Sequence, residues 1–276
     1  MGTNLTFGYA AKDATDEANR AMTELMQLVG DQAGVTIALS ALSTYDRVAQ
    51  LVHKGEIDLA WVPPIPFIAL LRNESVVPLA CPQRGGTHYH GAIVVGADAP
   101  VGDLSLLVGK RAAWVERYSA AGFVVPRIEL AKAGLDVKKA FSSQRFFGSH
   151  AAVVQAVADG AADFCATFVR LAPNGAVIGG PWIGKPDVER KLRIFAMFGE
   201  IPPDVLAARD GLDASVRERV RASLLGLSKT ARGAELLDTV FGAEGIFVPS
   251  TARYEALREE AAAAVERELL EIAAPN

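Results

Sequence analysis

The sequence contains little cysteine and no long apolar run. Its two cysteines, Cys81 and Cys165, lie in apolar stretches and not at the spacing of metal ligands. We expect two buried free thiols, because cysteine often packs as a small hydrophobic side chain, and a disulfide is the alternative. No run reaches the roughly 18 apolar residues that a membrane-spanning helix requires.

An excess of basic residues and the common nucleotide-binding motifs are also absent. The formal charge is −4 at pH 7 and no basic stripe occurs, which argues against nucleic acid as a partner. Gly179-Gly180 is not followed by Lys and Ser or Thr, and the sequence has no GxGxxG motif. We therefore expect no cofactor of the nucleotide type.

The sequence also shows no arrangement of residues that is typical of a catalytic or metal centre. No nucleophile stands beside a base, so no catalytic residue is predicted. His88 and His90 would share one face of a strand, but no third ligand lies nearby in the sequence to complete a metal site.

The first residues, MGTNLTFGYA, have neither the basic segment nor the apolar core of a signal peptide. Two expectations for localisation follow from this. The protein is cytoplasmic, or it is periplasmic or membrane-associated and an export signal has been removed.

What the sequence does contain is an alternation of strands and helices. Half of the residues are hydrophobic, enough for one large or two medium domains. The first predicted strands are Leu5–Tyr9, Val35–Leu39 and Ile57–Val62, with helices at Ala14–Val29 and Asp46–His53 between them. This order predicts parallel strands joined by right-handed crossovers.

A second region of the same kind follows Gly109, and helices follow the strand Leu192–Phe198. In this second region the predicted helix Ala121–Ala133 contains Pro126, which conflicts with a helix unless it lies in the first turn. The helices predicted after Leu192–Phe198 are Pro203–Arg209, Ala214–Leu227, Ala231–Val240 and Tyr254–Leu270. The chain therefore reads as an α/β protein of two lobes, with the second lobe inserted into the first.

One stretch, Phe146-Phe147-Gly148-Ser149-His150, reads as a strand end, a turn and a helix start. Ser149 is a candidate N-cap, and His150 would occupy the first helical position. A hydroxyl, an imidazole and open N–H groups at the positive end of a helix favour binding of an anion.

Several segments, taken in order, resemble the phosphonate- and phosphite-binding proteins of ABC importers, a branch of the type II periplasmic-binding-protein fold. The segments are Ser43-Thr44-Tyr45, Gly55–Trp61, His88-Tyr89-His90-Gly91, Ser119-Ala120-Ala121-Gly122, Phe147-Gly148-Ser149-His150 and Glu200-Ile201-Pro202. The resemblance implies two α/β lobes, a central cleft and two hinge crossings. Lobe 1 would hold residues 1–95 and 195–276, and lobe 2 would hold residues 96–194.

The resemblance also implies a ligand site built around two helix starts that face one cleft. The implied ligand-binding residues are Tyr45, Trp61, Tyr89, Ser119, Ala120, Ala121, Ser149, His150 and Thr167. Ala120 and Ala121 depart from the family, in which hydroxyl side chains are usual in this loop. The identity of the anion therefore stays open.

The expected function is that of a solute-binding protein, without catalysis, for ABC-type import. It would capture a small anion, such as a phosphonate, phosphite, phosphate or related oxyanion, as a monomer, and a transporter permease is the expected partner. One alternative is a cytoplasmic small-molecule enzyme on the same fold, of the menaquinone or thiamine-pyrimidine biosynthesis type. The other alternative is the ligand-sensing domain of a larger regulator.

Overall fold

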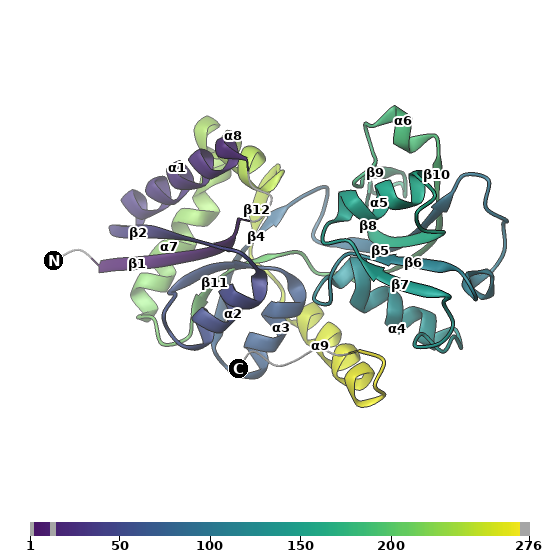
Figure 1. Cartoon of the computed structure of the whole chain (residues 1–276). Helices are drawn as coiled ribbons and strands as arrows, with labels where there is room; N and C mark the ends of the chain where they lie inside the picture. The colour runs from purple at the N-terminus through teal and green to yellow at the C-terminus, as the bar shows by residue number, and fades with distance from the viewer. Residues whose placement is uncertain (1–2, 12–14, 271–276) are drawn as a thin grey trace. The chain divides into compact units, whose positions relative to one another are not determined.

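The computed structural model describes residues 3–11 and 15–270. The chain divides into two compact units, each built on its own β-sheet (Figure 1). Unit 1 holds the chain up to Thr87 and again Pro203–Tyr254, and unit 2 holds His88–Pro202 and the C-terminal segment from Glu255. No helix in the described ranges is long and apolar enough to cross a membrane.

The strands of unit 1 are β1 (Thr3–Ala10), β2 (Val35–Leu42), β3 (Leu59–Val62), β4 (Val76–Gln83), β11 (Val205–Arg209) and β12 (Gly245–Phe247). They form one sheet in the order β12-β4-β11-β3-β1-β2. β1 pairs in parallel with both β2 and β3, as the alternation of strands and helices predicts. β11 lies antiparallel between β3 and β4.

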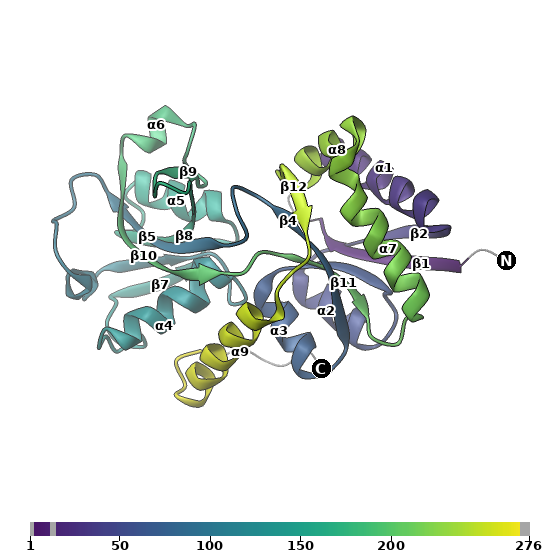
Figure 2. The same ribbon diagram turned by 180° about the vertical axis from the view of Figure 1, so that it is seen from behind.

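The helices of unit 1 are α1 (Asp16–Ala33), α2 (Tyr45–His53), α3 (Pro64–Arg72), α7 (Ala214–Gly226), η3 (Leu227–Lys229) and α8 (Ala231–Phe241). One face of the sheet is covered by α1, α7 and α8, and the other by α2 and α3 (Figure 2). α1 buries Met22, Leu25, Met26 and Val29 against the sheet, as an amphipathic helix does. Thr15 caps this helix, and the predicted start at Ala14 lies outside the described residues.

The segment Pro203–Arg209 is a strand, and the helix predicted for it is wrong. Its residues Val205–Arg209 form β11, with Leu206 paired to Trp61 on one side and to Ala80 on the other. A central strand of this kind satisfies its backbone on both edges and buries its side chains. Those tertiary contacts outweigh the weak local preference of a short segment that contains Leu and Ala.

The strands of unit 2 are β5 (Tyr89–Gly96), β6 (Arg111–Trp114), β7 (Ser143–Phe146), β8 (Phe164–Leu171), β9 (Val177–Gly179) and β10 (Leu192–Ile201). The main path of the sheet is β10-β5-β8-β6-β7, and β9 pairs with β8. β6 pairs in parallel with β7 and β8, whereas β5 runs antiparallel to β8 and β10.

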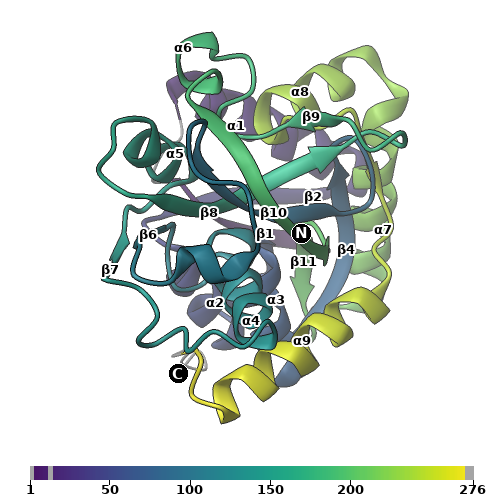
Figure 3. The ribbon, with the colours of Figure 1, turned by 90° about the vertical axis from the view of Figure 1, so that its right-hand side faces the viewer.

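The helices of unit 2 are η1 (Leu104–Leu107), the π-helical turn η2 (Ala120–Val124), α4 (Val125–Lys132), α5 (His150–Ala158), α6 (Pro186–Glu189) and most of α9 (Thr251–Glu266). α4 and α5 cover opposite faces of the sheet (Figure 1). α9 runs beside α4 (Figure 3), and Lys132 forms an ion pair with Glu260 between these two helices. The buried guanidinium of Arg127 on α4 donates to the carbonyl of Leu269 after α9.

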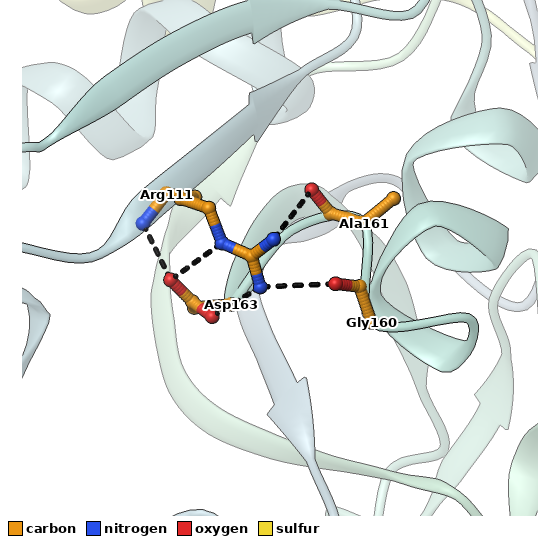
Figure 4. Close-up of polar contacts among 4 residues, drawn as sticks. All are labelled: Arg111, Gly160, Ala161 and Asp163. Atoms are coloured by element: carbon orange, nitrogen blue, oxygen red, sulfur yellow. Dashed lines mark hydrogen bonds and ion pairs between the residues drawn. The ribbon is translucent and has the colours of Figure 1, made fainter.

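In each unit, an aspartate just before a central parallel strand accepts hydrogen bonds that fix the start of that strand. Asp163 precedes β8, and its carboxylate accepts from the backbone N–H of Arg111 at 2.7 Å and from the Arg111 guanidinium (Figure 4). The same guanidinium donates to the carbonyls of Gly160 and Ala161. In unit 1, Asp58 precedes β3 and accepts in the same way from Thr6 N and Arg209. Asp163 and Asp58 both lie at the amino ends of their strands, opposite the edge where ligands bind in such sheets.

We expect the Asp163→Asn variant to be less stable than the wild type at neutral pH. The hydrogen bond from Arg111 lowers the pKa of Asp163 in the folded state, so this stabilisation is present above the ordinary aspartate pKa and is lost as the pH falls through the lowered value. Thermal unfolding should show a Tm lower by roughly 2–4 °C at pH 7. The difference should shrink below about pH 4.

The exposed Asp98 supplies the control, since Asp98→Asn should leave the Tm unchanged at both pH values. A Tm difference for Asp163→Asn that is equally large at pH 7 and pH 3 would contradict the role of the charged carboxylate.

Candidate anion-binding site

The carboxyl ends of three parallel strands of unit 2 meet at one edge of the sheet. Because β6 pairs in parallel with β7 and β8, the segments that follow these strands leave the sheet on the same side. Ligands bind at this edge in open α/β sheets. The segments after β6 and β7 both lead into helices here, and each helix start is preceded by a serine.

Ser119 and Ser149 cap the two helix starts. Ser119 Oγ accepts from the N–H of Gly122 at 3.0 Å, and Ser149 Oγ accepts from the N–H of Ala152 at 3.2 Å. Each hydroxyl keeps its own proton for donation, and the helices supply no acceptors for the remaining first-turn N–H groups. The cap predicted at Ser149 and the helical start at His150 are confirmed. The edge therefore presents donors at the positive ends of two helices.

Val115, which follows β6, connects the two helix starts through its backbone. Its N–H donates to the carbonyl of Gly122 at 3.2 Å, and its own carbonyl accepts from the N–H of Gly148 at 2.8 Å. Gly148 has a φ of +83°, a conformation that favours glycine, and it directly precedes Ser149. One peptide segment thus fixes the position of both serines.

The π-helical turn η2 explains how a proline fits this helix start. Pro126 has no N–H and cannot donate to the carbonyl of Gly122, four residues earlier. That carbonyl accepts from Val115, and Val124 N donates to Ser119 O with the wider spacing of a π turn. Pro126 then lies in the first turn of α4, where its missing N–H costs nothing.

His150, the first residue of α5, also contacts β8. Its Nδ1 lies 2.9 Å from Oγ1 of Thr167, whose side chain is 0% exposed. Its ring meets that of Phe168 edge-on, with centroids 5.0 Å apart. The sequence singled out His150 and Thr167 separately, but it gave no sign that they contact each other or that Phe168 belongs to the group.

Tyr89 joins the same group of side chains from the start of β5. Its ring lies perpendicular to that of Phe168, with centroids 6.4 Å apart. His88, the preceding residue, has its Nε2 3.8 Å from an oxygen of Glu200. Tyr89, His150 and Thr167 are therefore linked through Phe168, at the edge where Ser119 and Ser149 lie.

Cation–π contacts hold three arginines on the strands and loops of this region. The pairs are Arg117 over Phe146, Arg145 over Phe147 and Arg170 over Phe168, with distances of 5.4, 5.5 and 4.9 Å. They bring positive charge close to the helix starts, although the chain as a whole is acidic. These arginine–phenylalanine contacts could not be predicted from the sequence, because they depend on which phenylalanines the folded strands bring near each arginine.

Ala120 and Ala121, where the resemblance leads one to expect hydroxyls, are buried in unit 2. They are 3% and 1% exposed. Their peptide N–H groups belong to the first turn of η2, which has no acceptors for them within the helix. These two positions can therefore serve a ligand through the backbone but not through the side chain.

The two predicted residues of unit 1, Tyr45 and Trp61, belong to the carboxyl-end region of its parallel strands. Tyr45 begins α2, directly after the cap Thr44, and Trp61 lies in β3 against the ring of Phe241. The indole Nε1 of Trp61 is buried and has no acceptor among the residues that the structure describes. Both residues stay predictions as ligand contacts.

The two cysteines are buried and free, as predicted. Burial raises the pKa of the Cys81 thiol to about 12 and also raises the pKa of Cys165. Neither thiol forms the thiolate that a nucleophile requires near neutral pH. Within the described ranges, no three His, Cys, Asp or Glu side chains are grouped so that they could hold a metal ion.

Comparison with known proteins points to a binding protein. The family described as "ABC transporter, phosphonate, periplasmic substrate-binding protein" matches residues 7–254. Among solved structures, XAC2383 from Xanthomonas citri bound to chloride ion matches with a TM-score of 0.78 and 21% identity, covering 96% of this chain and 98% of that one.

Two further solved structures match this chain over nearly its whole length. PhnD1 from Prochlorococcus marinus, in complex with methylphosphonate, matches with a TM-score of 0.77 and 18% identity over 97% of this chain and 99% of that one. A binding protein component of an ABC phosphonate transporter from Pseudomonas aeruginosa has a TM-score of 0.74 and 17% identity, covering 98% and 96%. At these identities the structural matches establish the fold, which is that of the type II periplasmic binding proteins.

We expect Gly122→Ala to destabilise the protein and disturb the site together. A Cβ at this position would lie 2.4 Å from Cγ2 of Val115 and 2.7 Å from Oγ of Ser119, closer than atoms can approach. Such overpacking costs about 1–3 kcal/mol, measurable by urea unfolding. Gly96→Ala is the control in the same unit, because a Cβ there meets no atom within 4 Å. Equal stability of the two variants would contradict the tight arrangement around Val115.

Proposed function

This chain belongs to the family of periplasmic substrate-binding proteins of phosphonate ABC transporters, and we propose that it binds a phosphonate or a closely related small oxyanion. The family is one of binding proteins and not of enzymes. The proposed site is the edge of unit 2 at which Ser119 and Ser149 cap neighbouring helix starts. Delivery to an ABC permease and action in the periplasm belong to the same proposal.

The observation that carries the proposal is the connection of both caps through Val115. A tetrahedral oxyanion has several acceptor oxygens and therefore needs several donors that converge on one point. Two helix starts supply backbone N–H groups that are already ordered, and the serine hydroxyls add side-chain donors. His150 at the first position of α5 adds an imidazole N–H.

The buried methyl groups of Ala120 and Ala121 narrow the choice of donors. They leave the backbone, Ser119, Ser149 and His150 to hold the charged head of the ligand in unit 2. Tyr89 and the neighbouring Phe168 form an aromatic surface beside His150. This surface favours a ligand that carries a small carbon substituent next to its oxyanion, such as methylphosphonate, over phosphate.

Isothermal titration calorimetry against a panel of anions tests the ligand class. The panel is methylphosphonate, phosphite, phosphate, methanesulfonate and acetate. We expect measurable binding of methylphosphonate. In a separate unfolding measurement, methylphosphonate at 100 times its dissociation constant should raise the free energy of unfolding by about 2.7 kcal/mol. Binding of acetate alone, or of none of the five, would contradict the proposed phosphonate class.

Replacement of His150 tests the site. We expect His150→Ala to weaken methylphosphonate binding by roughly 10- to 100-fold, the effect of losing one hydrogen bond to a charged group. His53→Ala is the control, because His53 lies at the end of α2 in unit 1 and contacts Ser75. Equal affinities of these two variants would place the anion away from α5.

A further inference from the structure

Thr167 combines complete burial with a single polar contact. Its side chain, in the middle of β8, is 0% exposed. Its Oγ1 lies 2.9 Å from Nδ1 of His150, which is the hydroxyl's one hydrogen-bond partner within the described part of the chain. Bulk solvent does not reach a side chain in this position.

The direction of this hydrogen bond follows from the chemistry of the two groups. A hydroxyl has one proton to donate, and a buried donor without an acceptor is costly. The proton of Thr167 therefore goes to Nδ1, which must accept it with its lone pair. A neutral imidazole carries its proton on the other nitrogen, so Nε2 becomes the N–H donor.

The ring of His150 is also held in place by Phe168, the residue that follows Thr167. The two rings are perpendicular, at 83°, with their centroids 5.0 Å apart. Adjacent residues of β8 thus fix one nitrogen of the imidazole and the orientation of its plane.

We propose that Thr167 is a positioning residue for anion binding, which holds His150 as the Nε2–H tautomer so that the imidazole donates to the oxyanion. This rests on the proposed function for the use of that donor, whereas the tautomer itself is a property of the ligand-free protein. In this proposal Thr167 acts through His150 and does not touch the ligand. The resemblance had implied a direct contact between Thr167 and the ligand.

The tautomer is tested without any ligand by long-range 1H–15N NMR of the imidazole nitrogens at a pH where His150 is neutral. The signals of His150 among the four histidines are identified by their loss in His150→Gln. We expect Nε2–H in the wild type and in Thr167→Ser, and a shift toward Nδ1–H in Thr167→Val. An Nδ1–H tautomer in the wild type would overturn the proposal, even if the valine variant did not fold.

The consequence for binding is tested by a double-mutant cycle with methylphosphonate. Thr167→Val should weaken methylphosphonate binding about tenfold, because the imidazole of His150 loses the hydrogen bond that holds it as the Nε2–H donor. Thr167→Ser should stay within about twofold of the wild type, since it keeps the hydroxyl. In the His150→Ala background, Thr167→Val should cause no further loss.

The two ideas fail in different ways. If the wild type binds methylphosphonate and Thr167→Val weakens it equally with and without His150, Thr167 does not act through the imidazole and the positioning role is overturned. If the wild type binds none of the oxyanions, the proposed function fails, while the NMR result still decides the tautomer.

Discussion

Val115 is the residue on which the candidate site depends most. Its N–H and its carbonyl bond to Gly122 and Gly148, so a single peptide segment ties together two helix starts that are far apart in the sequence. The absence of a side chain at Gly122 is what allows this approach, because a Cβ would overlap the Val115 side chain. Ser119 and Ser149 lie next to these contacts, and their donors share one edge for that reason.

The same connection explains an otherwise unfavourable sequence. Pro126 comes six residues after Ala120, the first residue of the helical segment, and a proline there would normally leave a buried carbonyl unsatisfied. Here the carbonyl of Gly122 bonds to Val115, and the backbone widens into the π turn η2. The irregular helix start and the meeting of the two loops are thus one structural solution, which places first-turn N–H groups at the sheet edge.

How far the sequence predicts this protein depends on whether a feature is local. The cap at Ser149 was predictable, because an N-cap involves residues three positions apart. The parallel strands of unit 1 followed from their alternation with helices. β11 was missed, because Val205–Arg209 become a strand only through pairing with β3 and β4.

The same distinction applies within the site. His150 could be chosen from its place at a helix start, and Tyr89 from its resemblance to a family segment. The contact of His150 with Thr167, and the place of Phe168 between the rings of His150 and Tyr89, depend on the register of β8 against β5 and β6. No periodicity in the sequence specifies that register, so these partners emerge only from the folded chain.

A crystal structure of the protein grown with methylphosphonate tests the central claim most directly. The account predicts phosphonate oxygens within hydrogen-bond distance of the Ser119 hydroxyl and of the first-turn N–H groups that follow Ser119 and Ser149, with His150 donating to the same anion. A phosphonate held at another place, with this edge of unit 2 making no contact to it, would contradict the account.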